Sequence, residues 1–126
     1  MTIEQIKADI SRKLRKKMEQ TEREAEAIMF GEVGGYYGPV PKEYQWTGNL
    51  TTTPKTTGVS GGGLSVSMEA YLDTDVTWPT GRYGSNGELV ISATNEGHSG
   101  TLGNHGYWER SVEQIKAAAD AIFSSW

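Results

Sequence analysis

The amino-acid sequence predicts an α+β fold in a single domain over residues 1–126. Amphipathic helical patterns lie near the two ends of the chain, over 2–30 and 107–124. Between them, the segments 64–72 and 88–95 alternate apolar and polar residues as half-buried strands do. This order favours a long N-terminal helix and a C-terminal helix packed on a small antiparallel sheet.

The first helix is expected from Thr2 to about Phe30. Thr2 is the expected N-cap, with Gln5 as a weak capping-box partner. Apolar or small residues recur at steps of three or four, with Lys, Arg and Glu on the other side. This stripe is narrow, so it suits a small sheet or a helix of another subunit. Its members are Ile3, Ile6, Ile10, Leu14, Met18, Thr21, Ala25 and Ile28.

Charge is unevenly distributed along this helix. The basic run RKLRKK at 12–17 precedes the glutamates Glu19, Glu22, Glu24 and Glu26. The simplest interpretation is a solvated face with alternating pairs. A second is a contact in a symmetric oligomer, where the basic block of one copy meets the acidic block of its neighbour. A third and weaker one is contact with nucleic acid that passes nearby.

No helical period continues over 31–63, because glycines and prolines interrupt any regular element. The stretch TTTPKTTGVSGGG at 51–63 is rich in Thr and Gly, which is typical of a flexible arm or a long hairpin loop. We expect 64–72 and 88–95 to pair antiparallel across a long loop of turn residues. Two strands rarely support a domain, so a further strand is expected from 40–60 or from a partner subunit.

The last helix is expected over 107–124. Its stripe steps by four and three residues in turn, and glycines at 103 and 106 bracket its start. The stripe consists of Trp108, Val112, Ile115, Ala119, Ile122 and Trp126.

The composition excludes several classes of function. The net charge of -4 without a concentrated basic surface argues against general nucleic-acid binding. No apolar run approaches the roughly 20 residues needed to span a bilayer, and no secretory signal is visible. The absence of cysteine excludes disulfides, thiolate zinc sites and cysteine nucleophiles, and fits a reducing compartment. A hydrophobic fraction of 36% and 16 glycines indicate loop-rich structure that completes its burial against neighbours.

Candidate catalytic and metal-binding residues are few. His98, His105 and Glu96 could form a metal set, but no ligand spacing such as HExxH is present. The favoured interpretation is loop histidines that cap the following helix or bond a backbone carbonyl. Asp73 and Asp75, with Glu69 nearby, could run acid–base chemistry, but turn-forming aspartates are the favoured interpretation. The chain has neither a GxSxG elbow nor a phosphate loop. We therefore predict no catalytic residue, no metal and no cofactor.

Two short stretches carry a resemblance to a known family: YYGPVPKEYQWTGNL (36–50), which follows the first helix, and NEGHSG (95–100), which precedes the last. They resemble motifs of the small head–tail joining (neck or tail-completion) proteins of long-tailed bacteriophages. In that family, a tyrosine–arginine–threonine–glycine–x–leucine motif follows the first helix, often after paired tyrosines and a proline. YYGPVPKEYQWTGNL (36–50) is similar to it, although Trp46 stands where arginine is usual. NEGHSG (95–100) is similar to the family's loop before the terminal helix. The matching positions in 36–50 are Tyr36, Tyr37, Pro41, Tyr44, Thr47, Gly48 and Leu50.

The resemblance implies a structural virion protein without catalytic activity, a ring subunit near the connector or tail end. It implies homo-oligomers and other phage head or tail proteins as partners, no membrane, and DNA passage without specific nucleic-acid binding. The implied location is the virion, assembled in the host bacterial cytoplasm. The motif residues, with Trp46, would be interface anchors, and the arm at 51–63 would order by pairing with a strand of a neighbour.

Two alternatives stay open. A minor capsid protein of the same virion class shares nearly every feature. A small carbohydrate-binding module is a different class, in which aromatic side chains stack on sugar rings. Its candidate platforms are Tyr36, Tyr37, Tyr44, Trp46, Trp78 and Tyr83.

Overall fold

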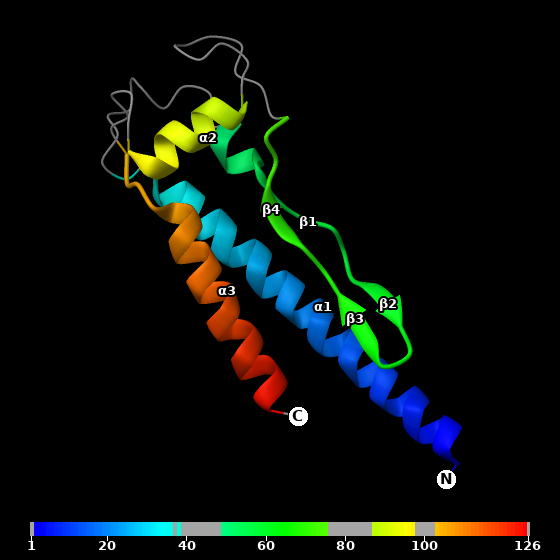
Figure 1. Ribbon diagram of the computed structural model, residues 1–126. Helices are drawn as coiled ribbons and strands as arrows, with labels where there is room; N and C mark the ends of the chain where they lie inside the picture. The colour runs from blue at the N-terminus through cyan, green and yellow to red at the C-terminus, as the bar shows by residue number, and fades with distance from the viewer. Residues whose placement is uncertain (1, 37, 39–48, 76–86, 98–102, 126) are drawn as a thin grey trace.

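The computed structural model describes residues 2–36, 38, 49–75, 87–97 and 103–125 and has the α+β fold that the sequence predicts. Helix α1 runs through the molecule, with helix α3 along one side and the strands along another (Figure 1). The elements are α1 (Ile3–Gly35), the short 3-10 helix η2 (Asn49–Thr52), β1 (Pro54–Thr56), β2 (Ser60–Gly62), β3 (Ser65–Ser67), β4 (Ala70–Leu72), α2 (Gly87–Glu96) and α3 (Tyr107–Ser124).

Helix α1 begins as predicted and ends later than predicted. Thr2 Oγ1 accepts the Gln5 N–H at 3.1 Å, and Gln5 Oε1 accepts the Thr2 N–H at 2.8 Å, so the capping box is complete. The predicted end near Phe30 is wrong, because the helix continues to Gly35. Its last turn buries Val33, and this packing outweighs the low helix propensity of the glycines there.

The two ends of α1 differ in burial. Its buried residues, spaced by four, all lie in the second half: Thr21, Ala25, Met29 and Val33. Ile3 is 66% exposed and Ile6 is 44% exposed. The C-terminal end of α3 lies beside Lys17, whose Nζ donates to the Ile122 carbonyl at 2.8 Å. The N-terminal end of α1 therefore projects beyond α3 and the strands (Figure 1).

The strands form one long hairpin whose turn is Gly63–Leu64. Both pairs are antiparallel: Pro54 lies opposite Leu72 in β1–β4, and Ser60 lies opposite Ser67 in β2–β3. Residues 57–59 on one side face 68–69 on the other, so a bulge shifts the register by one residue between the pairs. The predicted strand over 64–72 is accordingly divided into two.

The expectation of a further strand from 40–60 is confirmed by β1. Of the two interpretations of 51–63, the structure has the hairpin, because this segment pairs with β3 and β4 of its own chain. Arg15 holds the hairpin against α1: its Nη2 donates to the Gly61 carbonyl at 2.7 Å.

The predicted strand over 88–95 is wrong, since these residues lie in the helix α2. The prediction followed the alternation of Leu89, Ile91 and Ala93. Among the side chains described in this helix, Val90, Ala93 and Thr94 are buried, and these three share one helical face. The predicted pairing of 64–72 with 88–95 is wrong for the same reason.

Helix α3 has the predicted bounds. The most buried side chains of α3 are Tyr107, Ser111 and Ile122. The predicted apolar stripe is only half-buried at its start, where it passes through Trp108 and Val112. The helix lies antiparallel to α1 (Figure 1), and Trp108 in its first turn lines the same cleft as Leu72 of β4.

The main hydrophobic core lies at the C-terminal end of α1. Tyr107 is its largest fully buried side chain. The core consists of Val33, Tyr36, Leu50, Val90 and Tyr107, with Leu72, Ile91 and Trp108 packed against it. Among the helices described, none combines the length and the apolar character that crossing a membrane requires.

Candidate functional site

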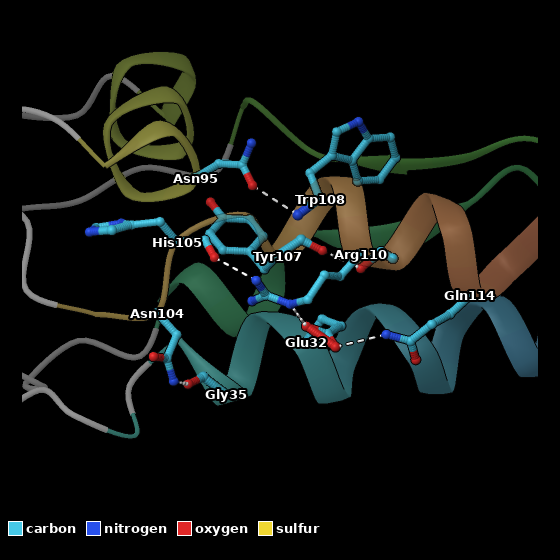
Figure 2. Close-up of polar contacts among 10 residues, drawn as sticks. Glu32, Gly35, Asn95, Asn104, His105, Tyr107, Trp108, Arg110 and Gln114 are labelled. Atoms are coloured by element: carbon cyan, nitrogen blue, oxygen red, sulfur yellow. Dashed lines mark hydrogen bonds and ion pairs between the residues drawn. The ribbon is translucent and has the colours of Figure 1, made fainter.

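The candidate site is the helix junction, where the C-terminal end of α1, helix α2 and the first turns of α3 meet (Figure 2). Two of the predicted motif residues lie here. Tyr36 is 6% exposed and Leu50 is 1% exposed, and both belong to the core. The other predicted interface residues lie outside the described residues: Tyr37, Pro41, Tyr44, Trp46, Thr47 and Gly48.

Tyr107 is the centre of the helix junction. Its ring lies edge-on to that of Tyr36, with centroids 6.2 Å apart and planes at 78°. Its hydroxyl lies 2.7 Å from Thr94 Oγ1 and donates to the Ile91 carbonyl at 3.2 Å. Thr94 Oγ1 in turn donates to the Val90 carbonyl at 2.8 Å. The buried hydroxyls are thus satisfied within the junction, which ties α3 to α2.

His105 lies beside Tyr107 and has a structural environment. Its Nδ1 lies 2.8 Å from the Thr94 carbonyl oxygen, so the proton on Nδ1 is donated there. The imidazole packs against Gly97, whose φ of 84° favours glycine. The backbone there lies so close to the ring that a Cβ at this position would clash with the imidazole. The interpretation of His105 as a histidine that bonds a backbone carbonyl is confirmed. His98 lies outside the described residues.

Two asparagines connect the ends of the helices, and sequence reasoning gave neither a role. Asn95 Oδ1 accepts the Trp108 N–H at 2.8 Å, at a helix start where Gly106 offers no side-chain cap (Figure 2). Asn104 Nδ2 donates to the Gly35 carbonyl at 3.0 Å, at the end of α1. Both satisfy backbone groups at helix ends. In the sequence, an asparagine near a helix end is only a weak signal for such a role, because the sequence does not identify the backbone group that the side chain will bond.

Charged groups join α1 to α3 on the solvent side of the junction. Arg110 Nε donates to Glu32 Oε1 at 2.6 Å, and Gln114 Nε2 donates to Glu32 Oε2 at 2.8 Å (Figure 2). Partial burial disfavours the ionised carboxylate, but the hydrogen bonds from Arg110 and Gln114 and the Arg110 charge outweigh it. The pKa of Glu32 is therefore lowered from its usual value of 4.5.

Of the candidate carboxylates, Asp73 and Asp75 form a turn directly after β4. Asp73 Oδ1 accepts the Asp75 N–H at 2.9 Å, and Lys55 Nζ lies 3.7 Å from Asp73 Oδ2. The interpretation of these residues as turn-forming aspartates is confirmed. In the described parts of the chain, no group of three or more His, Asp or Glu side chains could hold a metal ion.

The polar side chains of the helix junction are arranged to hold the three helices rigidly together. A polar depression of about 350 Å³ lies over Glu32, Asn104, His105 and Arg110. Glu32 and Arg110 pair with each other, and Asn104 and His105 bond backbone carbonyls. These groups hold the junction in one geometry, and each already has a partner.

Comparisons of the chain with protein-family models, with curated proteins and with solved structures found no match.

Proposed function

We propose that this chain is a structural protein of the virion of a long-tailed bacteriophage, a ring subunit that joins head and tail at the neck or completes the tail. It acts in the virion after assembly in the host bacterial cytoplasm, with copies of itself and with head or tail proteins. It needs no cofactor, and DNA passes it without specific binding. The proposal assigns it no catalytic activity.

The observation that supports the proposal best is the convergence of the two resembling motifs. They are separated by more than 40 residues in the sequence, yet the described parts of both meet at the helix junction. Tyr36 and Leu50 pack beside Tyr107, and Asn95 bonds the first turn of α3. Both motifs therefore contribute to the same junction through the first turn of α3.

The exposed end of α1 also supports an assembly role. Ile3 and Ile6 are both exposed, as the apolar side chains of an interface awaiting a neighbour would be. Tyr36, in contrast, is too buried to stack on a sugar ring. This removes one of the aromatic platforms on which a carbohydrate-binding module would depend.

The test is genetic and morphological. We expect an early stop codon in the gene, within the phage genome that carries it, to give filled heads and unattached tails in electron micrographs. Expression of the wild-type chain in the host should restore joined particles. Normal infectious particles that lack the chain would overturn the proposal. If the chain is instead labelled over the head shell, and head–tail joining stays intact without it, the minor capsid alternative would be favoured.

The aromatic motif can be tested separately. Tyr44→Ala and Trp46→Ala should leave the helical circular dichroism of the isolated protein nearly unchanged yet prevent joining in the same complementation experiment. Phe30→Ala, which removes an exposed aromatic outside the motif, is the matched control. Normal assembly with both motif substitutions would sink the assignment of 36–50 as an interface.

A further inference from the structure

The projecting end of α1 is an apolar ridge with basic flanks. Ile3, Ile6 and Ile10 follow at steps of three and four and lie on one face. At 100° per residue, Lys7 and Lys13 lie on opposite sides of this face. Residues 3–17 carry six basic and two acidic side chains, whereas the rest of the chain carries six basic and fourteen acidic. Two of the six basic residues in 3–17, Arg15 and Lys17, bond carbonyls of the hairpin and of α3. We call the face of Ile3, Ile6 and Ile10, with Lys7 and Lys13 on its two sides, the α1 ridge.

An apolar cleft with acidic edges lies at the other end of the molecule, among β4, α2 and the first turn of α3. Its volume is about 390 Å³, enough for a few aliphatic side chains and too little for a whole helix. No lysine or arginine lines it in the described part of the chain. Its apolar residues include Tyr71, Ile91 and Trp108, and its acidic residues are Glu88, Glu96 and Glu109.

The α1 ridge cannot reach the cleft of its own chain. The cleft lies against the far side of the core that Val33 enters, since Ile91 and Trp108 pack on that core. Ile6 and Val33 are separated by about 40 Å along the rigid axis of α1. The two surfaces are both apolar with charged edges of opposite sign, and they lie at opposite ends of the molecule. A contact between them must therefore join two copies.

We propose that the α1 ridge of one copy docks in the cleft of the next, with Lys7 and Lys13 against the acidic edge. Such a contact is heterologous, so it repeats head to tail and closes into a ring where the rotation between copies allows. It rests on the proposed function and deepens it, because it names the contact that builds the ring. The α1 ridge lies outside the two resembling motifs, and the cleft shares only its edge at 95–96 with the second motif.

Disulfide trapping tests the contact directly, because the chain has no cysteine of its own. An Ile6→Cys variant carrying a size tag is mixed with an untagged Ser92→Cys variant, Ser92 being part of the cleft lining. Under mild oxidation we expect the mixed disulfide to dominate on a non-reducing gel. Arg23→Cys, at an exposed position farther along α1, replaces Ile6→Cys as the control and should give little mixed product.

Two results would overturn the proposal. If Arg23→Cys and Ile6→Cys cross-link equally well to Ser92→Cys, the two copies meet by random collision and not through the α1 ridge. Cross-linking of Ile6→Cys only with itself would mean that the ridges of two copies pair with each other and leave the cleft empty.

Charge reversal provides an independent test, read by sedimentation over a range of concentrations. Lys7→Glu with Lys13→Glu should weaken self-association about tenfold, as should Glu88→Lys with Glu96→Lys. The self-association affinity of the variant with all four substitutions should recover to within about threefold of that of the wild type. Lys16→Glu with Arg23→Glu changes the net charge by the same amount on an exposed face away from the ridge, and should have a smaller effect.

Circular dichroism and thermal melting of each variant confirm that the fold is kept. A wild type that is monomeric at every concentration reached, or a fourfold variant that associates no better than the doubles, would overturn the docking proposal. Neither result bears on head–tail joining by the stop-codon experiment, so failure of this contact and failure of the proposed function are distinguishable.

Discussion

Arg110 and Glu32 join the first turns of α3 to the last turn of α1, with Nε and Oε1 2.6 Å apart. The pair lies next to the core, and Gln114 bonds the second carboxylate oxygen at 2.8 Å. This contact fixes how α3 lies along α1, and its strength depends on the ionisation of Glu32.

Glu32→Gln should lower the free energy of unfolding near neutral pH by about 1 kcal/mol, since it replaces a charge-assisted pair with a weaker neutral bond. The folded-state pKa of Glu32 is lowered from 4.5, so its stabilising effect is complete above that value and is lost as pH falls through the folded-state pKa. Urea unfolding should therefore show a difference between wild type and variant that narrows as the pH is lowered from 4.5 through the folded-state pKa. Glu24→Gln, on an exposed part of α1, is the control, and a difference independent of pH would contradict the assignment.

Tyr107→Phe should destabilise the protein by about 1–2 kcal/mol, because it removes the bonds of the Tyr107 hydroxyl to the buried Thr94 Oγ1 and to the Ile91 carbonyl. The ring itself is retained, so its contact with Tyr36 is kept. Tyr71→Phe removes a hydroxyl from a side chain that is 40% exposed and should change stability by less than about 0.5 kcal/mol. Chemical denaturation of both variants measures the contrast, and equal effects would show that the Tyr107 hydroxyl bonds contribute little.

Two glycine-to-alanine substitutions should have opposite effects. A Cβ at Gly103 would overlap the Tyr36 ring and its carbonyl oxygen, so Gly103→Ala should cost about 1–3 kcal/mol. At Gly31, inside α1, a Cβ meets nothing within 4 Å, so Gly31→Ala should stabilise by about 0.5–1 kcal/mol through helix propensity. Melting temperatures that move in the same direction would contradict this description of the junction.

Arg15→Met should loosen the hairpin without unfolding α1. Arg15 donates to the Gly61 carbonyl at 2.7 Å and to the Val59 carbonyl at 3.4 Å. Losing these bonds should speed amide hydrogen exchange over 57–67 by about fivefold, corresponding to about 1 kcal/mol. Lys16→Met, at an exposed neighbouring position, should leave exchange unchanged. Equal exchange in the two variants would show that other contacts hold the hairpin.

The sequence predicts best the long elements, in which apolar residues recur with a single period. The N-cap at Thr2 and the bounds of α3 are confirmed because capping and a repeated apolar stripe are local signals. The segment 87–96 is different. It is short, and its apolar residues fit both a period of two and a helical face through Val90, Ala93 and Thr94. Periodicity alone does not choose between them.

The candidate site was predictable only in part. The resembling motifs pointed to Tyr36, Leu50 and the 95–100 loop, but the sequence did not predict that these segments meet at Tyr107. Tyr107 itself was outside the predicted apolar stripe of α3, because that stripe ran through Trp108. The salt bridge of Glu32 with Arg110 spans 78 positions, and no local pattern indicates such a pair.

By itself, the sequence determined the α+β class, the two terminal helices and their apolar faces. Each depends on residues within a turn or two of one another, so the physics that selects it is local. Only the tertiary structure decided that 87–96 is a helix, that α1 continues through its glycines to Gly35, and that 51–63 pairs within its own chain. In these segments the local preferences are weak or divided, and burial against distant neighbours supplies the free energy that selects one conformation.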